Sequence, residues 1–187
     1  MMTETDFESL PRRIFLDSST LQTLLTYGEF VWENIEPSDI DRIRSVPNGI
    51  QNLDALRNIF FVNQRAGFEF ALSENSLSEV AARKDSRYLQ WAYDVLDHWL
   101  ICLEEGASIS GKRANLAAEL DGNSFGYLGA GDRLLIKDAI LLECDAFLTM
   151  EQRLPKNASH IQRELGLQIL TPIQYWDMLH PWARLYA

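Results

Sequence analysis

Short apolar runs alternate with helix-like stretches along most of the chain. Arg12–Asp17 is a brief β-type run that ends on an acid, and Ser18–Thr20 offer helix N-caps directly behind it. Further runs of the same kind are Phe68–Leu72, Ala146–Thr149 and Leu167–Thr171. Strands that alternate with helices predict an α/β fold, with a parallel sheet covered by helices on both faces.

Apolar spacing and capping residues predict the helices between these strands. Helical spacing runs from Ile50 until Gly67 ends it, and Ser73 caps the next helix. No element is predicted between Phe30 and Gly49, where prolines interrupt the pattern. The remaining expected helices are Ser86–Glu105, the short Ala114–Leu120, Asp132–Leu142 with Asp132 as its N-cap, Asn157–Gly166, and one from Ile173 onward.

Composition places the chain among ordinary globular proteins. Its 187 residues are 47% hydrophobic and 24% charged, which suits one domain over residues 12–187 after a loose arm at residues 1–11. No apolar run is long enough to span a bilayer, and the polar start lacks the apolar stretch of a secretion signal. With two cysteines and no disulfide framework, we expect a cytoplasmic protein that makes no membrane contact.

The charge is acidic, with 17 Lys and Arg against 27 Asp and Glu and a net charge of -10. Proteins that bind nucleic acid with affinity from counterion release usually carry a positive net charge. Carboxylates that hold divalent cations reverse this sign locally, so net charge alone does not exclude an enzyme that acts on nucleic acid.

Two familiar motifs match only in part. Gly106–Lys112 fits the phosphate-binding loop, but Arg113 stands where Ser or Thr should bind magnesium, and a helix precedes the loop instead of a strand. Gly122–Gly126 fits the nucleophile elbow around Ser124, but a helix-like stretch again replaces the required strand, so a serine hydrolase is a distant alternative. Zinc spacing is absent among the three histidines, His98, His160 and His180.

Four acids are predicted to reach one edge of the sheet. Asp17 ends the first strand, and Glu79 lies about two turns into the helix after the second. Asp132 heads the helix before the third strand, and Glu151 follows that strand by two residues. Carboxylates that lie close together repel one another and destabilise the fold unless a cation neutralises them. Their oxygen atoms are the hard ligands that Mg²⁺ and Mn²⁺ prefer. The pattern indicates metal-assisted phosphodiester hydrolysis, although Asp132 alone could be a simple N-cap and Glu79 a solvated helix residue.

At these residues the chain resembles the PIN-domain family, the ribonuclease fold of many VapC-type toxins. An apolar strand that ends in Asp and is followed by Ser is matched by Ile14–Ser19, and Ser73–Val80 matches the motif Ser-x-x-x-Leu-x-Glu. The family's last block, an Asp, an apolar helix and then Thr-x-Asp after a short strand, is matched by Asp132–Ala139 and Asp145–Glu151. Ile169–Pro172 resembles the family's last strand and its proline.

The resemblance spans nearly the whole chain and implies a Rossmann-like sheet. It also implies an RNA substrate and an antitoxin partner. We further expect a homodimer, with Ser18 and Thr149 among the residues that bind the substrate. The Mg²⁺ or Mn²⁺ ligands and catalytic residues that it implies are Asp17, Glu79, Asp132 and Glu151.

The chain departs from the family pattern in three ways. Glu151 stands where the family usually has Asp, and Asp138 is a rival for the third acid unless it is only a helix-surface charge. Inserts around residues 30–67 and 85–131 exceed what a minimal PIN toxin needs. The second insert carries Trp91 and Trp99, which form either core or a partner face.

Cations must meet the phosphate backbone of any RNA substrate. Lys112, Arg113 and Arg133 are near Asp132 in the sequence, which makes them candidates for substrate binding, although scattered surface cations would look the same. Arg12 and Arg13 precede the first strand and so lie at the wrong edge of the sheet.

Two functions therefore compete. The first is a metal-dependent endoribonuclease, acting as a toxin held by an antitoxin. The second is a non-catalytic PIN-like binding or dimerisation module with a weakened metal site, which the Glu at position 151 and the acidic charge favour.

Overall fold

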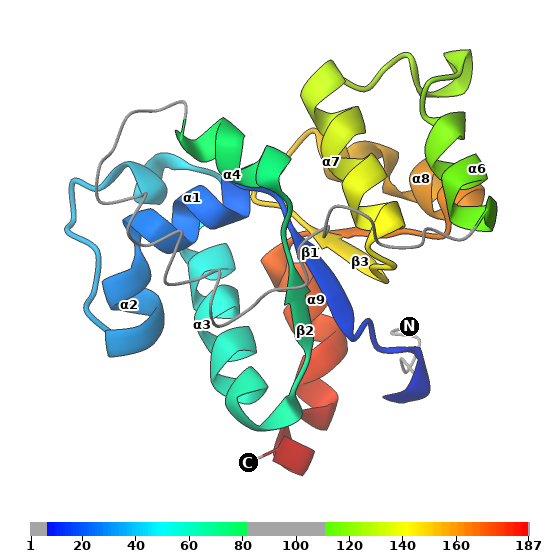
Figure 1. Cartoon of the computed structure of the whole chain (residues 1–187). Coiled ribbons are helices and arrows are strands. Elements are labelled where there is room, and N and C mark those ends of the chain that lie inside the picture. The colour runs from blue at the N-terminus through cyan, green and yellow to red at the C-terminus, as the bar shows by residue number, and fades with distance from the viewer. Residues whose placement is uncertain (1–6, 82–110, 187) are drawn as a thin grey trace.

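The computed structural model of the chain describes residues 7–81 and 111–186 (Figure 1). The helix predicted over Ser86–Glu105, with its two tryptophans, lies outside the described residues, as does most of the loop Gly106–Lys112. The arm predicted to be loose is packed from Phe7 onward. The Phe7 ring meets Trp182 edge-on at 5.5 Å, and the hydroxyl of Tyr175 donates to the carbonyl of Pro11.

The described strands form one parallel sheet, as the alternating pattern predicted. Their order across the sheet is β2-β1-β3-β4, which is compatible with a Rossmann-like fold. Register pairs Phe15 with Phe147 on the neighbouring strand, and the two rings stack at 5.4 Å. The strand bounds are β1 Arg13–Leu16, β2 Glu69–Ala71, β3 Ala146–Leu148 and β4 Gln168–Leu170.

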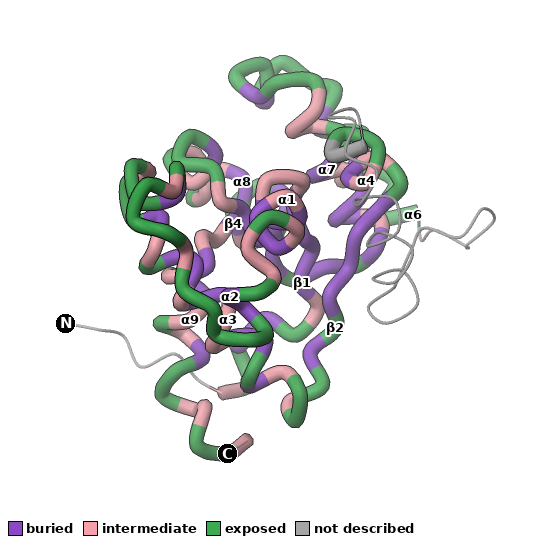
Figure 2. The backbone as a smooth tube through the Cα atoms, turned by 90° about the vertical axis from the view of Figure 1, so that its left-hand side faces the viewer, coloured by how far each residue is buried: buried purple, intermediate pink, exposed green. Residues whose placement is uncertain are grey.

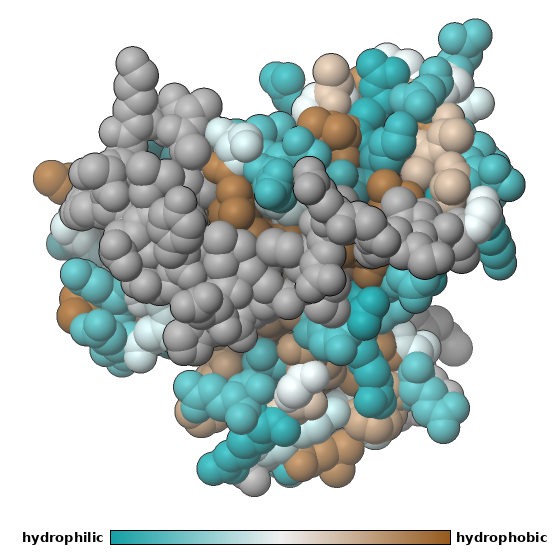
Figure 3. All heavy atoms as spheres, viewed as in Figure 1, coloured by the Kyte–Doolittle hydropathy of each residue, from teal (hydrophilic) through white to brown (hydrophobic). Residues whose placement is uncertain are grey.

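Helices cover both faces of this sheet because its strand residues are apolar on both sides. Ile14 and Leu16 face one core, which is closed by α1 (Ser18–Thr26), α3 (Gly49–Ala66) and α9 (Pro172–Leu179). Phe15 faces the opposite core, which is closed by α6 (Gly111–Glu119), α7 (Ala130–Leu141) and α8 (Ala158–Leu165). The strands are accordingly mostly buried in Figure 2, and hydrophilic side chains cover much of the described surface that Figure 3 shows.

The chain leaves β1 and β3 toward opposite faces of the sheet. After β1 it enters α1, which packs in the first core, and after β3 it enters α8, which packs in the second. Such a divergence opens a crevice beyond the carboxyl ends of the two strands, the usual ligand site of open parallel sheets. Asp17 and Thr149 directly follow these strands and so lie at their carboxyl ends.

Two ordered elements occupy the segment in which the sequence pattern predicted none. They are α2 (Gly28–Glu33) and the 3₁₀ helix η2 (Arg42–Ser45). The Tyr27 hydroxyl donates to Asp41, whose carboxylate also caps η2 by accepting from the backbone N–H of Ile43. Prolines therefore break the helical pattern here, but tertiary hydrogen bonds still order the chain.

Other predicted boundaries are confirmed. Gly67 and Gly166 end their helices in the left-handed conformation, with φ of 66° and 73°, which costs glycine little. Ser73 caps α4 (Glu74–Ala81) by accepting from the N–H of Ser76, and Thr171 forms a capping box before Pro172. The remaining short 3₁₀ turns are Phe7–Ser9, Asn123–Phe125, Leu154–Asn157 and His180–Tyr186. No helix in the described ranges is both long and apolar enough to cross a membrane.

Candidate metal centre

Asp17 is held in one orientation at the carboxyl end of β1. It is only 5% exposed, and its Oδ2 accepts hydrogen bonds of 2.6 Å from both Thr149 and Ser19. Ser18 donates a longer bond of 3.3 Å to Oδ1. Three hydroxyls thus surround a carboxylate that the strand end delivers to the crevice, and its orientation does not depend on solvent.

The loop after β3 is tied to the same point. The fully buried Thr149 hydroxyl accepts from the N–H of Glu151 at 3.0 Å, and the Ser19 hydroxyl accepts from the N–H of Met150 at 3.1 Å. The backbone N–H of Asp17 in turn donates to the carbonyl of Leu148 at 3.1 Å. These bonds fix the backbone of Glu151 relative to Asp17.

Asp132 approaches from α7. The prediction that it is the helix N-cap is wrong, because α7 begins earlier, with Gly129 at the N-cap, and Asp132 lies in its first turn. Burial raises the pKa of Asp132, and the negative charges of Asp17 and Glu79 raise it further, while the backbone N–H of Gly129 opposes the shift. Asp132 therefore lies in the electric field of two other predicted ligands.

Glu151 lies in the same field. Desolvation raises the pKa of its carboxyl, the charges of Asp17, Asp132 and Glu79 add to the effect, and Arg153 opposes it. The residue is exposed overall, so solvent screens these interactions. The sequence analysis does not predict Arg153 as a site residue, because its position two residues after Glu151 is the only indication that it lies near the acids.

Glu79 reaches the first turn of α7 from α4. A Cβ built on Gly131 would lie 2.8 Å from its Oε1, so any side chain at position 131 would displace this carboxylate. Glu79 is exposed, and its charge affects both Asp132 and Glu151. The bare backbone of Gly131 thus lets α4 and α7 bring two acids together.

The structure brings the four predicted acids into one neighbourhood, but their side chains do not converge on one point. Among residues 7–81 and 111–186, no three His, Cys, Asp or Glu side chains are placed to hold a metal ion together. The chemistry of the donors fits Mg²⁺ or Mn²⁺, because all four are carboxylates and hard cations prefer oxygen. Asp17 is fixed by hydrogen bonds, whereas Glu79 and Glu151 are exposed and have room to turn.

Asp138, the rival third acid, is not a surface charge. It is 5% exposed on α7, and its Oδ2 accepts from the hydroxyl of Ser73 at 2.6 Å and from the amide of Asn75 at 2.8 Å. These bonds join α7 to the start of α4, the helix that carries Glu79. Asp138 therefore has a structural partner set of its own, which leaves Asp132 as the third acid of the cluster.

The two hydroxyl side chains predicted to contact the substrate, Ser18 and Thr149, differ in their accessibility. Ser18 is partly exposed at the first position of α1, where it is accessible from the crevice. Thr149 is fully buried, and its hydroxyl is already engaged with Asp17 and Glu151. We therefore revise Thr149 from a substrate contact to a residue that positions Asp17.

The three basic residues predicted to bind substrate also differ in their distance from the acids. Arg113 pairs with Glu143 at 2.8 Å and donates to the carbonyl of Ile140, at the end of α7 away from Asp132. Arg113 and its neighbour Lys112 on α6 are therefore corrected to positions remote from the acids, because α6 begins beside the end of α7. Arg133 lies directly after Asp132 and stays a candidate for phosphate binding.

The structure offers no support for a serine nucleophile. Ser124 is exposed in the turn Asn123–Phe125, and helix α6 precedes that turn where a nucleophile elbow requires a buried strand. His160, one of the two histidines within the described part of the chain, shares a 2.8 Å hydrogen bond with the hydroxyl of Tyr127.

The parallel sheet and the position of the acids are compatible with a Rossmann-like fold, while membership of the PIN-domain family stays a prediction. No protein-family model matches the chain, and no curated protein matches it either. Function is therefore inferred from the residues of the crevice themselves.

Proposed function

We propose that this protein is a PIN-type endoribonuclease that hydrolyses RNA phosphodiester bonds with Mg²⁺ or Mn²⁺. The observation that carries the proposal is that four acids from separate parts of the chain lie in one neighbourhood near the carboxyl ends of β1 and β3. The charges of Asp17 and Glu79 raise the pKa of both Asp132 and Glu151, which is the relationship expected of carboxylates awaiting a cation.

The four carboxylates would hold the cation together, with Asp17 as the fixed ligand and Glu79 and Glu151 as adjustable ones. A cation bound there supplies a water of lowered pKa and offsets charge on a phosphoryl oxygen. Arg133 and Arg153 supply positive charge next to the acids for the phosphate backbone.

A second function, a PIN-like module that binds or dimerises without catalysis, is favoured by one observation. No three metal-binding side chains converge in the described part of the chain. In this reading the acids would be retained without a cation. The toxin role, the antitoxin partner, the homodimer and the cytoplasmic location follow from the resemblance and the composition, and they stay predictions.

Cleavage of a mixed panel of single-stranded RNAs tests the proposal. We expect cutting with Mn²⁺ or Mg²⁺ that stops with a chelator and in Asp132→Asn, while the exposed control Glu164→Gln cuts like the wild type. No cutting by a protein that also binds no metal would favour the binding module. Cutting that persists in chelator would contradict the metal-dependent mechanism.

A further inference from the structure

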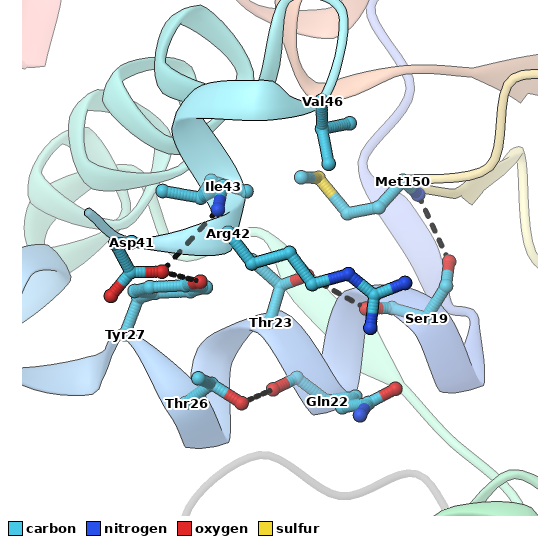
Figure 4. Close-up of a pocket in the computed structure, with 10 residues that line it drawn as sticks. All are labelled: Ser19, Gln22, Thr23, Thr26, Tyr27, Asp41, Arg42, Ile43, Val46 and Met150. Carbon is cyan, nitrogen blue, oxygen red and sulfur yellow. Dashed lines mark hydrogen bonds between the residues drawn. The ribbon is translucent and has the colours of Figure 1, made fainter. Parts of the chain in front are cut away.

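A groove of about 520 Å³ runs between α1 and the segment that contains η2 (Figure 4). Hydroxyl and amide side chains of α1 form one wall, and Arg42, Ile43 and Val46 form the other. Its volume lies within the range of ~300–1,000 Å³ that is typical of small-ligand sites. The groove is therefore large enough for one nucleotide but not for a double helix.

The groove adjoins the candidate metal centre through shared residues. Ser19 lines it and also donates the 2.6 Å hydrogen bond to Asp17. Met150 lines it as well, donates its backbone N–H to Ser19, and directly precedes Glu151. A chain seated in the groove would thus lie next to the residue that hydrogen-bonds Asp17 and the residue that precedes Glu151.

The Arg42 side chain has no partner among residues 7–81 and 111–186. Its guanidinium makes no hydrogen bond or ion pair with the rest of the described chain, and Figure 4 shows it extended along the groove toward Ser19. Arg44, on the same 3₁₀ helix, instead donates to the carbonyls of Ser38 and Pro37 at 3.0 and 2.9 Å. An arginine whose side chain pairs with none of the described residues, in a groove that shares Ser19 with the hydrogen bonds of Asp17, is suited to an anionic ligand.

The wall that carries Arg42 is formed in advance. The Tyr27 hydroxyl donates to Asp41, and the same carboxylate accepts the N–H of Ile43, so the start of η2 is anchored to the end of α1. Binding would therefore cost little ordering of this segment.

From these contacts we infer that the groove binds the nucleotide of a single-stranded RNA that lies next to the scissile phosphate. Arg42 meets the phosphate on the far side of that nucleotide, the hydroxyls of α1 meet the ribose, and the apolar side chains of Ile43, Val46 and Met150 meet the base. A cationic groove with surfaces for an unstacked base is the usual form of a single-strand site. The inference rests on the proposed nuclease function and adds the substrate's path to it.

Fluorescence anisotropy with the full chain tests this inference without requiring cleavage. The probe is a labelled single-stranded RNA of about ten nucleotides in chelator, titrated at several salt concentrations. Arg42→Gln is compared with Arg163→Gln, which changes the net charge equally but lies on α8, away from the groove. Thr26→Trp fills the groove while leaving Arg42 intact, and circular dichroism checks that each variant is folded.

We expect Arg42→Gln to weaken binding about tenfold and to lower the salt slope by about one, as the loss of one charge-assisted phosphate contact does. Thr26→Trp should weaken binding too, and Arg163→Gln should match the wild type. Metal-dependent cleavage that proceeds equally well in Arg42→Gln and Thr26→Trp would contradict RNA binding by the groove but agree with the nuclease function. RNA binding that depends on Arg42, without any cleavage, would support the groove and contradict the nuclease function. The absence of RNA binding and of cleavage would contradict both hypotheses.

Discussion

The Thr149 hydroxyl donates a 2.6 Å hydrogen bond to Oδ2 of Asp17, and both side chains are almost completely buried. This bond joins the ends of β1 and β3 at the point where the chain diverges to opposite faces of the sheet. Because the same hydroxyl accepts from the N–H of Glu151, one residue positions two of the four acids.

Thr149→Val should therefore impair metal binding more than folding. Valine keeps the shape of threonine, so the stability cost should come from the two lost hydrogen bonds, at about 1 kcal/mol for each. Misorientation of Asp17 should weaken Mn²⁺ binding about 10- to 100-fold, as the loss of an outer-shell partner usually does. Calorimetric titration with Mn²⁺ and thermal unfolding measure the two effects.

Thr20→Val is the matched control for that variant. Its hydroxyl is equally buried but donates to the carbonyl of Leu148 at 2.9 Å instead of to a carboxylate. Thr20→Val removes one buried hydrogen bond and should cost about 1 kcal/mol, while Mn²⁺ binding stays near that of the wild type. Equal loss of metal binding in both variants would mean that Thr149 has no special relationship with Asp17.

Asp138→Ala should destabilise the fold without removing a metal ligand. The substitution leaves the hydroxyl of Ser73 and the amide of Asn75 without their buried acceptor, which should cost about 2 kcal/mol. Urea unfolding measures the loss, and RNA cleavage well below the unfolding transition should persist. A fully folded Asp138→Ala that cannot cleave RNA would instead make Asp138 the third acid.

Asp132→Asn should stabilise the metal-free fold, unlike Asp138→Ala, and the gain should depend on pH. The folded protein raises the pKa of Asp132, so its neutral form is favoured and its ionised form is a cost in the folded state. In the metal-free protein, Asp132→Asn should therefore unfold at a higher temperature near neutral pH. The gain should fade below the ordinary carboxyl pKa of 3.8, where the wild-type side chain is also neutral. A gain that instead grows as the pH falls would show that the local field on Asp132 is not negative.

Arg133 and Arg113 should differ in their effect on RNA. Arg133→Gln removes a cation beside the acids and should lower the rate of cleavage several-fold, about as expected for one lost phosphate contact. Arg113→Gln removes a partly exposed pair with Glu143 and a hydrogen bond to the carbonyl of Ile140, both at the far end of α7, so cleavage should be unchanged. Equal loss in both variants would indicate that only net charge matters.

The sheet and its acids could be predicted because their signals are local. The strand Arg13–Leu16 and the acid after it can be recognised from a few neighbouring residues, and so can the N-cap at Ser73. The order of η2 could not be predicted in this way, since it depends on Tyr27 meeting Asp41 across 14 positions. Arg113 was misplaced for a related reason: closeness to Asp132 in sequence is not closeness in space when α6 and α7 pack against each other.

The role of Asp138 was also beyond the sequence pattern. Its position on a helix is compatible with either solvent or burial, and only the partners Ser73 and Asn75, more than 60 residues earlier, decide between them. The closeness of Asp17 and Glu151 followed from a rule about parallel sheets, because residues that follow adjacent strands lie at one edge.

Calorimetric titration of the wild type and Asp17→Asn with Mn²⁺ tests most directly whether the four acids form one cation site. Glu69→Gln is the control, because Glu69 pairs with Arg13 near the amino end of the sheet, at 2.6 Å. We predict binding by the wild type and by Glu69→Gln, and its loss in Asp17→Asn with the fold intact. Binding that survives in Asp17→Asn, or its absence from the wild type, would contradict the metal centre.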